Sequence, residues 1–175
     1  LAIHRILLMN AIMISYKGIP MFYHGDELSV LNDYSFLQDD ELADDSKWLH
    51  RSSINWEKVA KCLGNTETPE SIINTAIRRM IAIRKDTPEW SSTSSWRILN
   101  THNEFLFAYE RKLNDKAIVT IAYFKDDAQE LSANWLIQNG VNTNKVYERY
   151  TKEYLLVKNE AITLEPYQFL WLSEA

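Results

Sequence analysis

The stretch Gly18-Ile19-Pro20-Met21-Phe22-Tyr23-His24-Gly25-Asp26-Glu27 decides the fold class. Its apolar part, residues 19–23, is bounded by turn-forming residues, which is typical of a short strand buried on both faces of a parallel sheet. Acidic residues follow at the carboxyl end of this predicted strand, where α/β folds place their ligands. The stretch therefore predicts an α/β fold and raises the hypothesis of an enzyme.

Helices are predicted on both sides of this strand. Residues 1–17 carry apolar side chains around most of a helical circumference, so we expect this helix to be heavily buried. Gly18 suits the left-handed conformation that ends many helices. A second helix is predicted over residues 68–86, with Thr68 as its N-cap and Pro69 at its first position. Helix, turn and strand form one step of a parallel α/β fold.

Residues 28–65 form a long acidic connection in which we expect one or two short helices. Connections of this length inside compact domains are uncommon and are often functional. Residues 39–45 could bind calcium, but they lack the central Gly and the terminal Glu of a helix–loop–helix calcium site, which favours a solvated acidic loop. His24 has no partner at metal-ligand spacing, so neither a metal nor a cofactor is predicted.

The pattern changes after Pro88, where short β-rich runs separated by turns predict an antiparallel β-sandwich. The predicted strands are residues 96–99, 104–111, 117–124, 128–131, 146–150, 154–157, 161–164 and 167–172. The Ser-rich run 91–95 marks the boundary, so we predict two domains, residues 1–90 and 91–175. The many aromatic residues suit either the core of a sandwich or contacts with carbohydrate.

Composition narrows the function further. The 175 residues are 46% hydrophobic and 25% charged, as in an ordinary globular protein, and the formal net charge of -5 argues against a nucleic-acid partner. No run is long and apolar enough to predict a membrane span. The lone Cys62 cannot form an intramolecular disulfide, which favours a cytoplasmic location over a secreted one. The chain opens at Leu1 within a helical run, so we expect a fragment of a longer protein.

Two groups of charged residues are candidates for a site. Asp26 and Glu27 form a carboxylate pair, as glycoside hydrolysis requires, but adjacent strand residues point to opposite faces and cannot flank one bond. We therefore expect them to support a site. His50 and Arg51 follow the acidic run, where a basic side chain either clamps a polar ligand or forms a surface ion pair.

The residues quoted at the outset resemble the eighth-strand motif of the α-amylase superfamily of glycoside hydrolases, family 13. Residues 31–33 and 44–51 are similar to the amylosucrase branch, and residues 164–172 look like the last strand of its C-terminal domain. The resemblance implies the end of a (β/α)8 barrel, namely helix 7, strand 8 and helix 8, followed by an antiparallel β-sandwich. It implies a retaining reaction in which sucrose transfers its glucosyl group to the enzyme and releases fructose, and the glucosyl group then extends an α-1,4-glucan.

The resemblance places the family's catalytic carboxylates on earlier strands, so it implies no catalytic residue in this chain. It implies that Arg51 closes a glucosyl pocket through an ion pair with an acid upstream, and that Asp33 borders the acceptor channel. Asp26 and Glu27 would support the pocket. The parent could instead be an α-amylase or α-glucosidase, or the chain a non-catalytic glucan-binding sandwich. A barrel piece without its neighbours exposes apolar surface, so we also expect self-association, swapping or a rearranged packing of residues 1–27.

Overall fold

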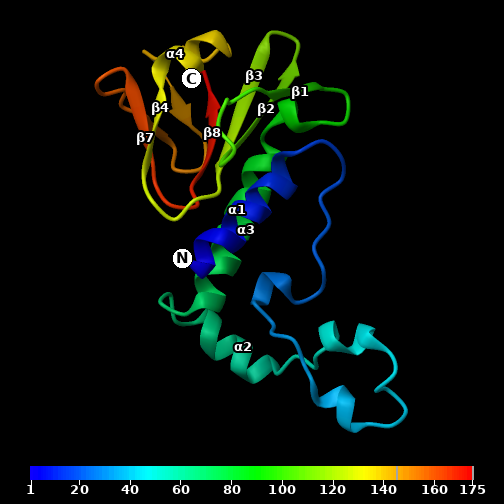
Figure 1. The fold of residues 1–175 in the computed structure, drawn as a ribbon. Helices are drawn as coiled ribbons and strands as arrows, with labels where there is room; N and C mark the ends of the chain where they lie inside the picture. The colour runs from blue at the N-terminus through cyan, green and yellow to red at the C-terminus, as the bar shows by residue number, and fades with distance from the viewer. Residues whose placement is uncertain (145, 175) are drawn as a thin grey trace. The chain divides into compact units, whose positions relative to one another are not determined.

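The computed structural model describes residues 1–144 and 146–174. The chain divides into two compact units, one formed by residues 1–20 and 78–175 and the other by residues 21–77 (Figure 1). The predicted division into residues 1–90 and 91–175 stays a prediction. Within the described residues, no helix is both long enough and apolar enough to span a membrane.

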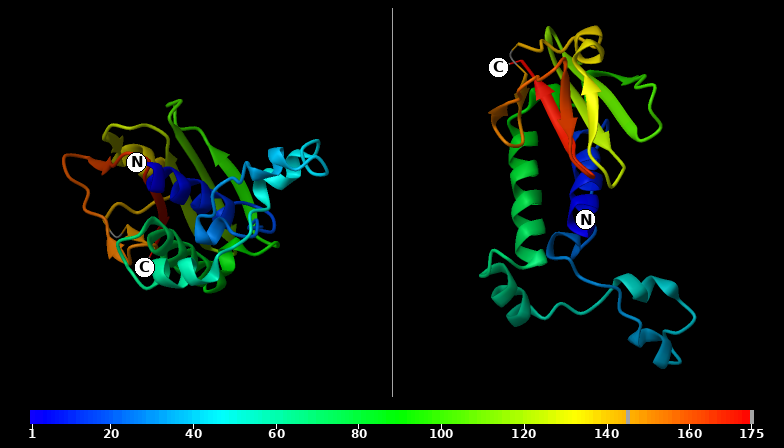
Figure 2. Two further views of the ribbon diagram at one scale, coloured as in Figure 1. Left: turned by 90° about the horizontal axis from the view of Figure 1, so that it is seen from below. Right: turned by 60° about the vertical axis from the view of Figure 1, so that its left-hand side comes forward.

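Two helices lie beside one another in the larger unit. Helix α1 (Ala2–Ser15) confirms the first predicted helix, and α3 (Pro69–Lys85) confirms the second. Figures 1 and 2 both place α1 beside the last turns of α3, where Arg84 donates hydrogen bonds to the carbonyls of Ile14 and Gly18. The C-terminal carbonyls of α1 thus receive the donors that a helix end lacks.

Fewer side chains of α1 are buried than the sequence predicted. Leu8, Ala11 and Ile14 are buried, but Ile6 and Met9 are 41% and 57% exposed. The expectation of heavy burial around most of the circumference was therefore wrong. Only one face of α1 packs against the sheet, as is usual for a helix on a sheet surface.

The predicted antiparallel strands are confirmed in number and in approximate position. The described residues hold β1 (Ser95–Leu99), β2 (Leu106–Leu113), β3 (Lys116–Tyr123), β4 (Gln129–Ser132), β5 (Tyr147–Glu148), β6 (Glu153–Tyr154), β7 (Ala161–Leu164) and β8 (Phe169–Ser173). A six-stranded sheet has the order β1-β2-β3-β8-β5-β6, and β4 pairs with β7 in a second sheet. A short helix that the sequence analysis missed, α4 (Ala133–Gln138), follows β4.

The two sheets and α4 enclose one hydrophobic core. Val119 and Ile121 of β3 contribute to it together with Leu131 of β4, Leu136 of α4 and Ile162 of β7. This shared core gives the predicted sandwich arrangement of two antiparallel sheets.

The opposite face of the six-stranded sheet carries aromatic side chains that pack beneath the helices. The ring of Tyr16 lies 5.0 Å from that of Tyr109, and the rings of Trp90 and Trp171 lie 4.7 Å apart, both in edge-on geometry. Tyr109 and Trp171 are fully buried. For these side chains the structure therefore favours a role in the core over contact with carbohydrate.

The smaller unit has little regular structure. It contains the 3-10 turns η1 (Asp26–Leu28), η2 (Ser35–Gln38) and η3 (Ser46–His50), and helix α2 (Trp56–Leu63). The long connection thus holds three short helical segments, η2, η3 and α2, where one or two short helices were expected. The first turns of α3 complete the unit.

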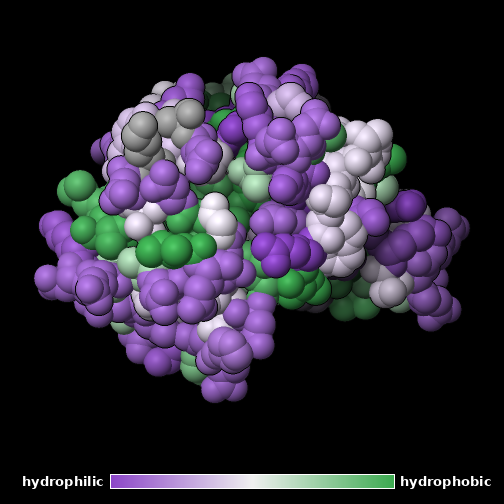
Figure 3. All heavy atoms as spheres, turned by 90° about the horizontal axis from the view of Figure 1, so that it is seen from above, coloured by the Kyte–Doolittle hydropathy of each residue, from purple (hydrophilic) through white to green (hydrophobic). Residues whose placement is uncertain are grey.

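The strand predicted over residues 19–23 is absent, so this prediction was wrong. Residues 17–23 form neither helix nor strand, and Ile19 and Met21 are 89% and 78% exposed. A strand requires neighbours that receive its N–H and C=O groups. No described segment pairs with this one, and the barrel segment implied by the resemblance is therefore not shown. Figure 3 shows that hydrophobic side chains also reach the surface as patches on the face viewed there.

Candidate functional site

The candidate site is built around a tight turn at Gly25. The backbone of Gly25 has a φ of 98°, and its carbonyl accepts hydrogen bonds from the N–H groups of Leu28 and Val30 at 3.0 and 3.1 Å. A Cβ atom at this position would lie 3.0 Å from a methyl group of Val30. Both the left-handed backbone and the close approach therefore require glycine here.

The carboxylate pair lies in this turn and not at the end of a strand. Asp26 and Glu27 belong to η1, so the expectation that they point to opposite faces of a strand was wrong. The Glu27 carboxylate accepts a hydrogen bond from the N–H of Gly25 at 3.1 Å, and the Glu27 carbonyl accepts one from the Asn74 side chain at 3.0 Å. Glu27 thus stabilises the turn, while Asp26 is exposed and lines a pocket.

That pocket has a volume of about 510 Å³ and lies between residues 23–32 and residues 47–51. Three contacts join its two sides. The Asp33 N–H donates to the Leu49 carbonyl at 2.9 Å, the Ser52 hydroxyl donates to the Leu31 carbonyl at 2.8 Å, and His50 Nδ1 lies 3.1 Å from Asn32 Oδ1. These bonds hold the second half of the loop against the first and form the cavity.

Arg51 lines this pocket, and its charge helps, after the hydrogen bonds and charge of Lys47, to lower the pKa of the Asp45 carboxyl. Its side chain is exposed, and its guanidinium lies 5.7 Å from the centre of the Trp48 ring, a cation–π distance. Among the described residues Arg51 has no acidic partner, whereas Lys47 pairs with Asp45. The structure thus presents to the cavity a guanidinium without an ion pair among the described residues. Such a group can bind a polar or acidic ligand.

Asp33, the other predicted binding residue, is used within the loop. Its carboxylate accepts a hydrogen bond from the N–H of Ser35 at 2.9 Å. Hydrogen bonds from the Ser35 side chain and backbone lower the pKa of the Asp33 carboxyl, which therefore stays ionised. The residues that line the pocket beside Arg51 include His24, which the sequence analysis considered only as a metal ligand, and Asn32, which it did not select as a binding residue. Their positions in the sequence, close to Asp26 and Asp33, could have pointed to them.

The acidic run after η2 also forms local turns. The Asp39 carboxylate accepts from the N–H of Glu41 at 3.0 Å, and that of Asp45 accepts from the N–H of Lys47 at 3.1 Å. In the described ranges, no three His, Cys, Asp or Glu side chains gather as a metal-ligand set. These carboxylates bind backbone N–H groups, which is a common role for Asp in loops.

Comparison with known proteins shows what this architecture is similar to. No family model matches the chain. The glucosylglycerate phosphorylase of Escherichia coli (strain K12) is 23% identical over 168 residues, which are 96% of this chain and 28% of that protein. A crystal structure of AmyP in complex with maltotriose matches with a TM-score of 0.74 and 17% identity, over 98% of this chain and 35% of AmyP.

A crystal structure of MutB in complex with sucrose matches with a TM-score of 0.67 and 17% identity, over 97% of this chain and 38% of MutB. MutB is the trehalulose synthase of Pseudomonas mesoacidophila MX-45. The chain therefore shares the fold of the parts of AmyP and MutB with which it aligns. The chain spans about a third of the length of these proteins.

Proposed function

We propose that this chain is the C-terminal portion of a retaining α-glucosyl-transferring enzyme of the α-amylase superfamily. The proposal rests on the difference between the share of this chain that is aligned and the share of each relative that is aligned. Nearly the whole of this chain aligns with sugar-acting proteins, yet it covers only 28% of the curated relative and 35% of AmyP. A retaining reaction requires two carboxyl groups about 5–5.5 Å apart across the scissile bond. The pocket of Arg51 offers one exposed carboxylate, Asp26, so the reacting groups would come from the remainder of the parent.

The more specific proposal is an amylosucrase-like reaction, which transfers glucose from sucrose to an α-1,4-glucan and releases fructose. The resemblance of residues 44–51 to the amylosucrase branch supports it, and MutB was crystallised with sucrose. In this proposal the unpaired Arg51 guanidinium meets an acid of the missing part, and Asp33 borders the acceptor channel. Asp26 and Glu27 support the turn beside them.

Phosphorolysis of a glucoside is a second candidate, because the curated relative is a glucosylglycerate phosphorylase. Both reactions would pass through a glucosyl-enzyme. They differ in the glucosyl donor and in the acceptor, which is a glucan in one and phosphate in the other. An α-amylase or α-glucosidase parent, with water as acceptor, is a further alternative that the match to AmyP favours. A glucan-binding sandwich without catalysis would bind glycogen but transfer nothing.

The test uses the intact parent enzyme with sucrose, in the presence of glycogen or of inorganic phosphate. Release of fructose with growth of glycogen supports the amylosucrase-like reaction, whereas formation of glucose 1-phosphate supports phosphorolysis. Retention of the isolated chain on a glycogen affinity gel would favour the binding module. Absence of any turnover of α-glucosides by the parent would refute the enzymatic proposal.

A pair of variants tests the role of Arg51 in the parent. Arg51→Ala should raise the barrier in kcat/KM by about 2–5 kcal/mol if its charge is paired across the pocket. Lys61→Ala removes a positive charge from the exposed face of α2 and should change that barrier by less than about 0.5 kcal/mol. Equal effects of the two variants would leave Arg51 a surface residue.

A further inference from the structure

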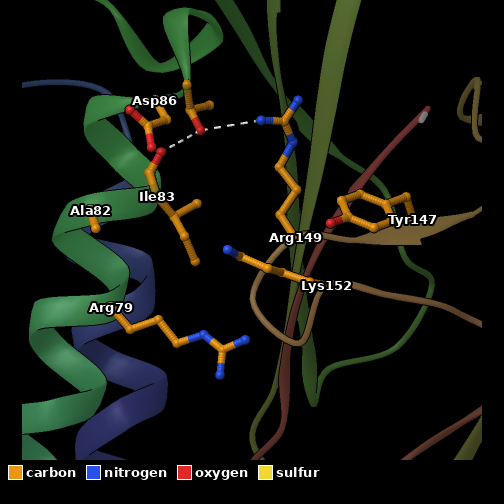
Figure 4. Close-up of a pocket in the computed structure, with 8 residues that line it drawn as sticks. Arg79, Ala82, Ile83, Asp86, Tyr147, Arg149 and Lys152 are labelled. Carbon is orange, nitrogen blue, oxygen red and sulfur yellow. Dashed lines mark hydrogen bonds between the residues drawn. The ribbon is translucent and has the colours of Figure 1, made fainter.

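A second pocket lies within the larger unit, between α3 and the end of β5, and contains three basic side chains (Figure 4). Its volume is about 310 Å³, at the lower end of the range for small-molecule sites. Arg79 reaches it from α3, and Arg149 and Lys152 reach it from the segment that follows β5. All three lie outside the pocket of Arg51.

One of these cations is already held by the protein. Arg149 donates from Nε to the Ser173 hydroxyl at 3.1 Å and from Nη1 to the Thr87 hydroxyl at 3.3 Å, and its Nη2 lies 3.9 Å from a carboxylate oxygen of Glu89. Its side chain is 23% exposed. Arg149 therefore forms a fixed, largely compensated wall of the pocket.

The other two cations are uncompensated. Among the described residues, neither Arg79 nor Lys152 forms an ion pair. The Arg79 guanidinium lies 4.7 Å from the centre of the Tyr150 ring, which positions it without neutralising it. Figure 4 shows the guanidinium of Arg79 extending from α3 and the amine of Lys152 reaching toward α3 from the opposite wall.

Lys152 reaches the pocket from an unfavourable backbone conformation. Lys152 has a φ of 65°, a left-handed conformation that a lysine rarely adopts, and its N–H donates to the Glu148 carbonyl at 2.9 Å. The one acidic lining residue, Asp86, is seven residues from Arg79 on α3, a rise of about 10 Å along the helix axis. The carboxylate of Asp86 is thus displaced from the Arg79 charge.

We propose that this pocket binds a phosphoryl dianion, either inorganic phosphate or the phosphate group of a hexose phosphate. Two unpaired cations on opposite walls repel one another, and an anion between them converts this repulsion into two attractions. The guanidinium can bind two phosphate oxygens at once, and the lysine can bind a third as a point charge. The pocket has room for a sugar ring beside the phosphate, with the exposed part of Tyr147 at its wall. This inference does not rest on the proposed glucosyl transfer.

Isothermal titration of the 175-residue chain at constant ionic strength tests the site. The probes are inorganic phosphate and glucose 1-phosphate, with glucose as the uncharged comparison. The variants Arg79→Gln and Lys152→Gln should each weaken phosphate binding on the order of tenfold, because each removes a charge-assisted contact. Lys85→Gln is the matched control, since this exposed lysine of α3 does not line the pocket. Far-UV circular dichroism confirms that the variants fold.

The expected result is saturable binding of one phosphate per chain that is weakened about tenfold in each pocket variant and kept in the control. Tighter binding of glucose 1-phosphate than of phosphate would identify the hexose phosphate as the ligand, and equal binding would identify the phosphoryl group alone. Absence of saturable binding to either probe, or equal loss in Lys85→Gln, would overturn the proposal.

Discussion

Arg111 of β2 holds the end of α1 against the sheet, and its removal should destabilise the larger unit. Its side chain is 1% exposed. Its guanidinium donates to the carbonyls of Tyr16 at 2.9 Å and Ser91 at 2.6 Å, and to the Ser94 hydroxyl at 3.0 Å. No carboxylate is among these partners. Burial, and then the charge of Arg84, lower the pKa of the Arg111 guanidinium, which shows that the site is costly for a cation.

The loss of stability in Arg111→Met can be estimated from the hydrogen-bond acceptors that remain without a donor. Replacing a buried ion pair by apolar residues can be neutral, but here the acceptors are backbone carbonyls that remain after the substitution. The Tyr16 carbonyl then lacks its donor, at a cost of about 1–3 kcal/mol, whereas the Ser91 carbonyl keeps the hydrogen bonds that the N–H and hydroxyl of Ser94 donate to it. Removal of a buried charge offsets part of that cost, so we expect a loss of about 1–2 kcal/mol in the free energy of unfolding.

Urea unfolding followed by far-UV circular dichroism measures this loss, with an unchanged m-value as the sign that only stability has changed. The matched control is Arg97→Met in the neighbouring strand. Arg97 pairs with Glu110 at 3.0 Å, but its side chain is 57% exposed, so its loss should cost less than about 1 kcal/mol. Equal effects of the two substitutions would refute the reasoning that burial, and not the charge itself, makes Arg111 important.

Three further predictions concern the turn, the buried tyrosine and the exposed apolar surface. Gly25→Ala should destabilise the turn by about 1–3 kcal/mol and accelerate local hydrogen exchange, whereas Gly18→Ala, also at positive φ but with open space around it, should do less. Burial raises the pKa of Tyr109 to about 12 from 10.0, so the unfolded chain loses this proton first. Stability should therefore fall between about pH 10 and pH 12, and urea unfolding should show a shallower fall for Tyr109→Phe. The chain should self-associate through exposed side chains such as Met21 and Leu31, which are 78% and 83% exposed. Light scattering should show less association for the double substitution Met21→Glu with Leu31→Glu, and a monomer at every concentration of the original chain would contradict this.

The sandwich could be predicted from the sequence because its determinants are local. Each strand carries an apolar pattern of its own, and polar turns such as Asn114-Asp115 separate the strands. The short α4 was missed because it spans only six residues, and Asn139-Gly140 after it is also typical of a hairpin turn. Helical and hairpin patterns are hard to distinguish over so few residues.

The failure at residues 19–23 has a different cause. An apolar run forms a strand only where other strands receive its backbone groups, and the described residues provide none. Burial of residues 19–23 therefore depends on neighbouring strands and does not follow from the apolar side chains alone. The same holds for the implied ion pair of Arg51, whose acid the resemblance places upstream of this chain.

The phosphoryl site was beyond sequence analysis for a third reason. Arg79 and Lys152 lie 73 positions apart, and only the packing of the β5–β6 segment against α3 brings them to one pocket. Arg111 was missed likewise, because a charged residue within a strand pattern is usually solvent-exposed. Long-range pairing of charges depends on topology, which single residues do not encode.

The main proposal is that this chain is the C-terminal portion of a retaining α-glucosyl-transferring enzyme whose reacting carboxylates lie in the remainder of the parent. Its most direct test is a side-by-side assay of the intact parent and the isolated 175-residue chain with sucrose and glycogen, with products followed by NMR of the anomeric protons. We expect α-configured products from the parent and no fructose from the isolated chain. Release of fructose by the isolated chain, or inverted products from the parent, would contradict it.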